Sequence, residues 1–514
     1  MTRSSMVKVS LIGSIAAVTL FASPSLAQRV WFVDDDAPGD PGPGDPLVSD
    51  PNEDGSIAHP FDAIAEAVGR AADGDVVLVR DGVYTGSGNH DIDFEGRLIL
   101  VRSENGPESC IIDCQRRGRA FFLDQGETAD AVIEGFTITN GFAESSNGGA
   151  IDCTLDSSPT IRDCRFIDNE AAGLGGAVAL RGGSRSIVSN CHFEGNVCFG
   201  ASEGSQGGAL SCFFLAHATV VNCTFLNNSS QWGGAVDASL SEPVFVNCVF
   251  VDNFATHAGG AIFMSAARPT FINCTAAFNI AQSGGGMALV GAVLPSFAFA
   301  DNCVFWGDAP NEISIGLGEA TLTYSLVMGG WPGEGNIDAD PLLIDAFNGD
   351  VRLSEASPCI DAGHNGALPL FATADRYGAP RFVDDPDTPD TGLGASPVVD
   401  IGASEFYGDE FVLFRPAPGL VARSNRIVAE NAPPGATVYF AWGLRGGSTT
   451  VPGCAGVTID IESARLAGSA VADAGGAAVF ELLAPLTARG ASVLLQAVER
   501  ENCRTTNLVS LRFP

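Results

Sequence analysis

Hydrophobic and polar positions alternate along the middle of the chain in short runs that recur every 25 to 32 residues. Each run places a cysteine and, two positions later, a phenylalanine at the same parity, so both side chains lie on one face of a short strand. No run holds an apolar pattern at helical spacing over ten residues, so the repeat predicts strands. The repeated positions are Cys164, Cys191, Cys223, Cys248, Cys274 and Cys303, with Phe166, Phe193, Phe225, Phe250 and Phe305 two residues on and Ala276 as the one exception.

Polar and glycine positions mark the turns of the same repeat. A chain that coils once per repeat stacks equivalent positions about 4.8 Å apart, so the asparagines can form a ladder of side-chain hydrogen bonds while the glycines permit close backbone approach. The pattern predicts a right-handed parallel β-helix. Asparagine follows the first five cysteines by five residues, at Asn169, Asn196, Asn228, Asn253 and Asn279, and Gly-Gly recurs at 148–149, 175–176, 207–208, 233–234, 259–260 and 284–285.

The cysteine column predicts stacked thiols, because parallel side chains in register have poor geometry for bridging. The absence of a Cys-x-x-Cys pair disfavours a metal or redox role. Cys110 and Cys114, which precede the column, are expected to form bridges. Cys454 and Cys503 are expected to form a disulfide with each other.

The pattern changes at both ends of the repeats. Phe61, Ile64, Ala65, Val68 and Ala72 follow helical spacing and predict an amphipathic helix that caps the open end of the solenoid. After Cys303 we expect strands to continue through "DRYGAPR" and "VVDIGASE", which places the β-helix over residues 57–406. Alternating runs and turns over residues 411–514 predict a small antiparallel β-sandwich. The fold class is therefore all-β.

The N-terminus predicts export. Arg3 and Lys8, an apolar run over residues 9–22 and Ser-Leu-Ala at 25–27 are typical of a signal peptide, residues 1–27. The run is too short to span a bilayer, and no later stretch is long enough, so no transmembrane segment is expected in the mature protein. Residues 28–56 follow as an acidic, Pro/Gly-rich segment.

The net charge of the chain narrows the classes of partner that it can bind. The chain has 61 Asp and Glu against 27 Lys and Arg, a formal net charge of −34. A nucleic-acid or anionic-membrane partner is disfavoured, because both require basic patches. A polysaccharide or a cell-surface component remains as partner, although an acidic polysaccharide would be repelled unless calcium or clustered arginines intervened.

Three sets of motifs resemble known families. "GGAV…FIDN", "GGAL…FLNN" and "GGAI" resemble the repeats of polymorphic outer membrane proteins. "GNIDADPLL", "SPCIDAG", "DRYGAPR" and "DIGASE" resemble the closing segment of β-helix proteins of the choice-of-anchor Q type, and "PFDAIAEAV…GDVVLVRDGVY" resembles the capping segment of the wider pectate-lyase-like superfamily. The resemblance covers roughly residues 30 to 405 and implies a right-handed β-helix. That fold hosts lyases, hydrolases, epimerases, tailspikes and adhesins, so it implies no single activity.

One loop carries a calcium signal. Asp50, Asn52, Asp54 and Gly55 match the first half of an EF-hand loop, although Phe61 stands where a bidentate Glu is expected. We therefore predict Asp50, Asn52 and Asp54 as calcium ligands, with a flexible acidic linker as the alternative. No other cofactor is expected.

The densest charged group lies near the end of the predicted solenoid. It is either a polar site or a set of ion pairs that fixes the last turn, and the second interpretation is favoured. His257 is expected at an exposed turn, and His192 and His217 have no evident repeated acidic partner. The charged group comprises Asp361, Asp375, Arg376, Arg381, Asp400 and Glu405.

Together these features favour an exported, non-catalytic scaffold for adhesion or glycan binding, with the C-terminal module as an accessory. No lysine remains to act as a lyase base after residue 8, and no catalytic residues can be assigned. Trp232 and Trp306, the tryptophans of the repeats, are few for a sugar-stacking groove. The alternative is a polysaccharide lyase or glycoside hydrolase acting in a groove on the β-helix, which the fold alone supports.

Overall fold

The structure is a computed structural model of the 514-residue chain. It describes residues 28–36, 50–200, 205–291, 294–408, 411–414, 416, 419, 424–485, 488 and 490–513. The predicted signal peptide, residues 1–27, and residues 37–49 of the acidic segment lie outside the described residues. Within the described ranges, no helix has the length and apolar character needed to cross a bilayer.

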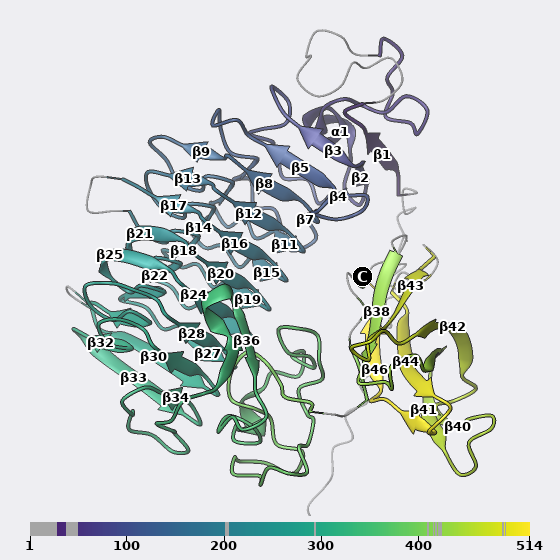
Figure 1. Cartoon of the computed structure of the whole chain (residues 1–514). Helices are drawn as coiled ribbons and strands as arrows, with labels where there is room; N and C mark the ends of the chain where they lie inside the picture. Colours follow the sequence, from purple (N-terminus) through teal and green to yellow (C-terminus); the bar gives the residue numbers. More distant parts are fainter. Residues whose placement is uncertain are drawn as a thin grey trace, which may run out of the picture.

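Short parallel strands coil into one column and form four sheets along it, as Figure 1 shows. An eleven-stranded sheet consists of β1 (Val30–Val33), β2 (Val76–Val79), β4 (Leu100–Ser103), β7 (Val132–Glu134), β11 (Thr160–Arg162), β15 (Ile187–Ser189), β19 (Thr219–Val221), β23 (Val244–Val246), β27 (Thr270–Ile272), β30 (Ser296–Asp301) and β33 (Gly318–Thr323). A ten-stranded sheet consists of β3 (Gly82–Tyr84), β5 (Cys110–Asp113), β8 (Thr137–Thr139), β12 (Arg165–Ile167), β16 (His192–Glu194), β20 (Thr224–Leu226), β24 (Val249–Val251), β28 (Thr275–Ala277), β31 (Val304–Trp306) and β34 (Leu326–Val327).

The other two sheets complete each coil. An eight-stranded sheet consists of β6 (Phe121–Leu123), β10 (Ile151–Cys153), β14 (Val178–Arg181), β18 (Leu210–Phe213), β22 (Val236–Ser239), β26 (Ile262–Ser265), β29 (Met287–Leu289) and β32 (Ile313–Ile315). A five-stranded sheet consists of β9 (Phe142–Ala143), β13 (Glu170–Ala171), β17 (Val197–Cys198), β21 (Ser229–Trp232) and β25 (Phe254–Ala258). The predicted parallel solenoid is confirmed.

Identical side chains stack inside the column, as the repeat predicts. Phe166, Phe193, Phe225 and Phe250 form one stack, with successive ring centroids 4.7, 4.7 and 5.0 Å apart. The column cysteines are buried thiols whose Sγ atoms face backbone carbonyls, as for Cys191 and the carbonyl of Ser189 at 3.3 Å. This stacking contributes to the apolar burial that holds the coils together.

The asparagine ladder is confirmed. Nδ2 of Asn169 donates to Oδ1 of Asn196 at 3.0 Å, and the same contact joins Asn196 to Asn228 at 2.9 Å. Each Oδ1 also accepts the backbone N–H of the preceding asparagine, so every buried amide has partners above and below. The ladder continues to Asn279 and ends at Asp308, whose Oδ1 accepts from N and Nδ2 of Asn279 at 2.7 and 2.8 Å.

A second polar column precedes the cysteines. Asn190, Asn222 and Asn247 adopt φ near +54°, a conformation that asparagine tolerates better than most residues. Nδ2 of Asn222 donates to Oδ1 of Asn190 at 3.2 Å, and Nδ2 of Asn247 donates to Oδ1 of Asn222 at 3.0 Å. These asparagines therefore form and hydrogen-bond the turn between the eleven-stranded and ten-stranded sheets.

The Gly-Gly pairs occupy a corner where a side chain cannot fit. Gly233 has φ of +68°, and a Cβ added at Gly234 would lie 2.1 Å from the carbonyl oxygen of Gly260 on the next coil. Close approach between coils therefore requires glycine at this position.

The N-terminal helix is shorter than predicted and lies beside β1 and β2 (Figure 1). α1 (Ile64–Arg70) buries Ile64, Ala67 and Val68 in the solenoid core. Phe61 instead bridges to Val33 of β1, which moves the start of the helix to Ile64. This is where a capping helix would lie, and the capping role itself stays a prediction.

Part of the expected acidic segment is structured. β1 pairs with β2, because its aromatic and branched side chains complete the first coil. The aspartates that follow β1 are fixed by hydrogen bonds. Oδ2 of Asp34 accepts from Nη1 of Arg80 at 2.6 Å, and Oδ2 of Asp35 accepts from the backbone N–H of Val83 at 2.9 Å. The solenoid therefore begins before residue 57, where we had expected a linker.

The closing segment, residues 341–406, differs from the prediction. After β34 it adds no coil. It forms the antiparallel pair β35 (Leu343–Asp345) and β36 (Asp350–Leu353), with two short 3₁₀ helices, η1 (Ala346–Asn348) and η2 (Asn365–Ala367). The strands predicted at "DRYGAPR" and "VVDIGASE" are absent. The closing segment instead packs on the outer face of β24, β28 and β31. There Ala346, Val351 and Ala403 cover Val249 and Val251.

The C-terminal residues form antiparallel sheets around a core of their own. Cys454 and Cys503 form the predicted disulfide. The bridges predicted for Cys110 and Cys114 are wrong: both remain buried thiols inside the solenoid. The strands are β37 (Val412–Leu413), β38 (Ser424–Glu430), β39 (Thr437–Gly443), β40 (Gly446–Thr450), β41 (Thr458–Ile461), β42 (Arg465–Val471), β43 (Ala478–Leu483), β44 (Ser492–Glu499), β45 (Arg504–Thr505) and β46 (Val509–Arg512), and a β-sandwich stays a prediction.

The end of the asparagine ladder generates a stability prediction. Burial, and next the charge of Glu312, raise the pKa of Asp308 well above its usual value, and Oδ2 of Asp308 has no hydrogen-bond donor. The folded state therefore retains a proton that the unfolded chain releases, so this contribution to stability is lost as pH rises through the folded pKa. Asp308→Asn places an N–H donor in the position of Oδ2 and should raise the free energy of unfolding by about 1–3 kcal/mol at pH 8.

Thermal unfolding at pH 5 and pH 8 measures this effect. The gain from Asp308→Asn should be larger at pH 8 than at pH 5. Asp252→Asn, an Asp of the same solenoid that lies outside the ladder, is the control and should show no such difference. A gain independent of pH would contradict the retention of a proton by Asp308 in the folded state.

Candidate functional site

The predicted calcium loop lies just before α1, and its acids are engaged locally. Oδ1 of Asp50 accepts from the backbone N–H of Asn52 at 2.9 Å, and Oδ2 of Asp50 lies 2.7 Å from Nδ1 of His59. Oδ1 of Asp54 accepts from the backbone N–H of Ser56 at 2.9 Å. These bonds lower the pKa of both aspartates. Calcium binding by Asp50, Asn52 and Asp54 stays a prediction.

A neighbouring acidic group was missed. Carboxylate oxygens of Glu53, Asp62 and Glu66 lie within 4.8 Å of one another, and Glu53 comes from the predicted loop itself. Burial raises the pKa of Glu66 to about 7, with further contributions from the charges of Glu53 and Asp62. Asp62 follows Glu53 by nine residues and Glu66 follows Asp62 by four, a spacing that the calcium-loop pattern does not include.

The charged group of the closing segment forms a buried cluster. The Arg381 side chain is fully buried; its Nη1 lies 3.3 Å from Oε2 of Glu405, and its Nη2 donates to the carbonyl of Gly402 at 2.7 Å. Asp375 accepts the backbone N–H groups of Ala379 and Glu405 at 2.8 and 2.9 Å. These carboxylates satisfy backbone groups that lack a strand partner, which explains why the segment needs no sheet.

Burial dominates the electrostatics of this cluster. It raises the pKa of Asp375 to about 6 and that of Asp400 to about 8, and it raises the pKa of Glu405 well above its usual value. One arginine therefore cannot hold all three carboxylates ionised at neutral pH. Since Asp375, Asp400 and Glu405 expose 2% or less of their surface, the geometry favours the structural interpretation.

Arg376 leaves the buried cluster and reaches the outer face of the ten-stranded sheet. Its Nε donates to Oγ1 of Thr224 at 2.9 Å, at the border of the closing segment. Beside it on β16, Nε2 of His192 lies 3.0 Å from Oε2 of Glu194. Burial lowers the pKa of His192, and the charges of Arg165 and Arg376 lower it further, while Glu194 opposes them. His192 thus has an acidic partner, which the sequence pattern did not reveal.

The early arginines are engaged by carboxylates. Nη2 of Arg162 lies 2.6 Å from Oε2 of Glu134, and Nη1 of Arg165 lies 2.7 Å from Oε1 of Glu108. Nε of Arg181 lies 2.9 Å from Oδ1 of the buried Asp152. The pairs of Arg162 with Glu134 and of Arg181 with Asp152 join neighbouring coils, and the pair of Arg165 with Glu108 spans the coil between them.

Aromatic side chains gather along the five-stranded sheet. The rings of Phe142 and Phe199 stack with centroids 5.8 Å apart, and Trp232 stacks on His257 at 4.8 Å. Phe199 and Phe254 expose 42% and 46% of their surface. We call Phe142, Phe199, Trp232, Phe254 and His257 the aromatic strip. His257 lies in β25, so its predicted place in a turn is wrong, although it is exposed.

The strip follows the solenoid axis. In the sheet register Phe142 aligns with Glu170, Glu170 with Val197, Val197 with Ser229 and Ser229 with Phe254, so Phe142 and Phe254 stand four coils apart. Four coils span about 19 Å. Trp306 does not join the strip, because it packs beneath the closing segment.

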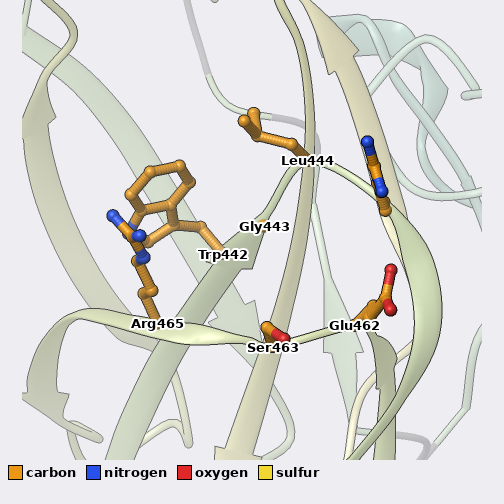
Figure 2. Close-up of a pocket in the computed structure, with 7 residues that line it drawn as sticks. Trp442, Gly443, Leu444, Glu462, Ser463 and Arg465 are labelled. Carbon is orange, nitrogen blue, oxygen red and sulfur yellow. The ribbon is translucent and has the colours of Figure 1, made fainter.

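A hollow of about 320 Å³ lies among the C-terminal strands. Figure 2 shows the Arg465 guanidinium beside the Trp442 indole, and its Cζ lies 5.7 Å from the ring centroid. Leu444 and Glu462 lie on the other side in Figure 2, and Arg445 also lines the hollow. An aromatic ring flanked by arginine and glutamate can bind a polar, ring-shaped ligand.

Comparison with known proteins supports the fold. Residues 97–276 match the family model described as a right handed beta helix region, in agreement with the parallel sheets. No curated protein shows a significant match to the chain. The crystal structure of a pectate lyase is similar at 13% identity and a TM-score of 0.41, covering 74% of this chain and 96% of that chain. A likeness of this strength carries no conclusion about activity.

The buried cluster generates the second prediction. Arg381→Ala leaves buried carboxylates without their cation and should lower stability by about 3–5 kcal/mol. Arg352→Ala removes a half-exposed ion pair with Asp350 in the same segment and should cost less than about 1 kcal/mol. Chemical unfolding of the three proteins measures both. Unchanged stability with lost ligand binding in Arg381→Ala would show instead that the cluster is a binding site.

Proposed function

We propose that this chain is an exported, non-catalytic scaffold that binds a polysaccharide through the aromatic strip of its β-helix, at or outside the cell surface. The observation that carries the proposal is the row of aromatic rings along the five-stranded sheet, of which Phe199, Phe254 and His257 are exposed. Sugar rings present apolar C–H faces, and aromatic rings with a positively polarised edge and a negative face bind such faces well.

The geometry of the strip suits a polymer. Rings on the coils of β9, β17, β21 and β25 place aromatic contacts at several points along the axis, while the coil of β13 contributes none, so an extended glycan could follow the axis. Many weak contacts of this kind raise the overall affinity, because each bound sugar raises the effective concentration of the next, as expected for adhesion. A compact catalytic site would instead require reacting groups to converge on one point.

Charge favours a neutral glycan. The formal charge of −34 repels anionic polymers, and the one arginine at the strip, Arg116, is engaged by both carboxylate oxygens of Glu170. The Arg116 guanidinium also lies 4.2 Å over the Phe142 ring, which holds that ring in place. The hollow at Trp442 provides a second contact point for the same polymer in the C-terminal module.

Export and surface location remain part of the proposal. They rest on the predicted signal peptide, residues 1–27, and on the resemblance of the repeats and the closing segment to polymorphic outer membrane proteins and to choice-of-anchor Q proteins. The C-terminal sheets would serve as the accessory or attachment module.

A second candidate function is a polysaccharide lyase or hydrolase, and one observation favours it. His192 has a lowered pKa, so its imidazole is neutral at pH 7, and it lies between Arg165 and Arg376 on the sheet face that the closing segment leaves open. A neutral imidazole can accept a proton from a sugar carbon while an arginine binds a neighbouring uronate carboxylate.

The strip generates a binding prediction. Phe254→Ala should weaken binding to the preferred polysaccharide about tenfold, or 1.4 kcal/mol, since one exposed aromatic contact is lost. Affinity electrophoresis against a panel of neutral and acidic polysaccharides measures this. Phe382→Ala is the matched control, because Phe382 is also 46% exposed but lies in the closing segment. Equal binding by both variants and the unmodified chain would rule out the strip.

The enzymatic alternative has its own measurement. Release of reducing ends and of unsaturated products from the same polysaccharides would show cleavage. If His192 is the base, His192→Ala should lower that release by at least a hundredfold, whereas His217→Ala, a histidine 3.9 Å from Glu242 outside this face, should not. No release from the folded chain favours the scaffold.

A further inference from the structure

Acidic side chains of one loop gather around a buried carboxylate in the closing segment. Oxygens of Asp361, Asp384 and Asp390 lie within 4.8 Å of one another. Asp361 exposes 0% of its surface, whereas Asp384 and Asp390 are exposed. The group therefore has a closed side at Asp361 and an open side toward solvent.

The backbone holds this arrangement in place. The N–H groups of Thr391 and Gly392 donate to the carbonyl of Asp361 at 2.9 and 3.1 Å. The N–H of Asp385 donates to Oδ2 of Asp361 at 3.3 Å. Both ends of the loop are thus tied to Asp361, and the position of Asp384 and Asp390 follows from the fold.

One oxygen at the centre lacks a partner. Oδ1 of Asp361 is buried and accepts no hydrogen bond, although a buried carboxylate oxygen normally has a donor or a cation. The nearby guanidinium of Arg381 is engaged by Glu405 and Gly402. Among the described residues, no arginine or histidine forms an ion pair with Asp361, Asp384 or Asp390, so like charges converge here.

We propose that Asp361, Asp384 and Asp390 bind one Ca²⁺ ion. Calcium takes six to eight oxygen ligands, accepts bidentate carboxylates and completes its shell with water, which the open side supplies. Oxygens bound at 2.3–2.6 Å to one ion lie at most about 5 Å apart, which fits the observed spread. The ion supplies the partner that Oδ1 of Asp361 lacks.

Binding at this site would stabilise the closing segment. The N–H of Asp361 donates to Oδ1 of Asp400 at 2.8 Å, and Asp400 belongs to the buried cluster around Arg381. An ion that draws the loop onto Asp361 therefore anchors the segment covering the solenoid. This site is separate from the loop of Asp50, Asn52 and Asp54.

Calorimetric titration of the whole chain with CaCl₂, after chelator treatment, tests the proposal. We expect a dissociation constant of about 10⁻⁴ to 10⁻³ M, as in other calcium modules exposed to millimolar calcium. The variant Asp384→Asn/Asp390→Asn, both positions being exposed, should lose one binding equivalent. Calcium at 10 mM, about ten or more times the dissociation constant, should raise the melting temperature of the unmodified chain. The variant should lose this upward shift.

Two controls make the result specific. Asp387→Asn changes an exposed acid of the same loop outside the group and should retain the equivalent. Asp50→Asn/Asp54→Asn should retain it as well. Titrations that are identical for the unmodified chain and for Asp384→Asn/Asp390→Asn overturn the proposal, and so does loss of that equivalent in the Asp50→Asn/Asp54→Asn protein instead.

Discussion

The hydrogen-bonded ladder of asparagine side chains sets the register of the solenoid, and the rest of the structure depends on that register. A buried amide must find a donor and an acceptor, and each asparagine finds both on the neighbouring coils. A slip by one residue would break the ladder and turn every inward side chain outward. Because the register holds, phenylalanine meets phenylalanine inside the column, while ion pairs and aromatic rings line up outside it.

The same need for hydrogen-bond partners explains the closing segment. Inside the solenoid, strands satisfy one another's backbone groups. Over residues 357–406 carboxylates of Asp375 and Asp400 take that role, while apolar side chains cover the outer face of the ten-stranded sheet. Burial keeps part of these carboxyls protonated, so stability in this region is coupled to pH. The part of the ten-stranded sheet that the closing segment covers cannot serve as a binding face.

The candidate sites were predicted from sequence only in part. The pattern located His257 and Trp232 in the repeats but not their stacking, since that contact joins residues on neighbouring coils. His192 and Glu194 are two residues apart, yet Arg376, which also acts on His192, comes from a segment far along the chain. Asp361, Asp384 and Asp390 likewise meet only because the loop folds back. Such contacts depend on how segments return to one another, which short-range periodicity does not encode.

The sequence by itself determined the parallel solenoid, its stacked cysteines and phenylalanines, its asparagine ladder and the disulfide between Cys454 and Cys503. The solenoid, its stacks and its ladder follow because each repeat carries the same residues at the same offsets, and stacking identical coils is enough to place them. The disulfide follows because residues 411–514 contain only these two cysteines. Only the tertiary structure decided that the closing segment covers a sheet face and that acids and aromatic rings gather at particular points. There the partners belong to unlike segments, and packing of apolar faces with satisfaction of buried polar groups selects which of them meet.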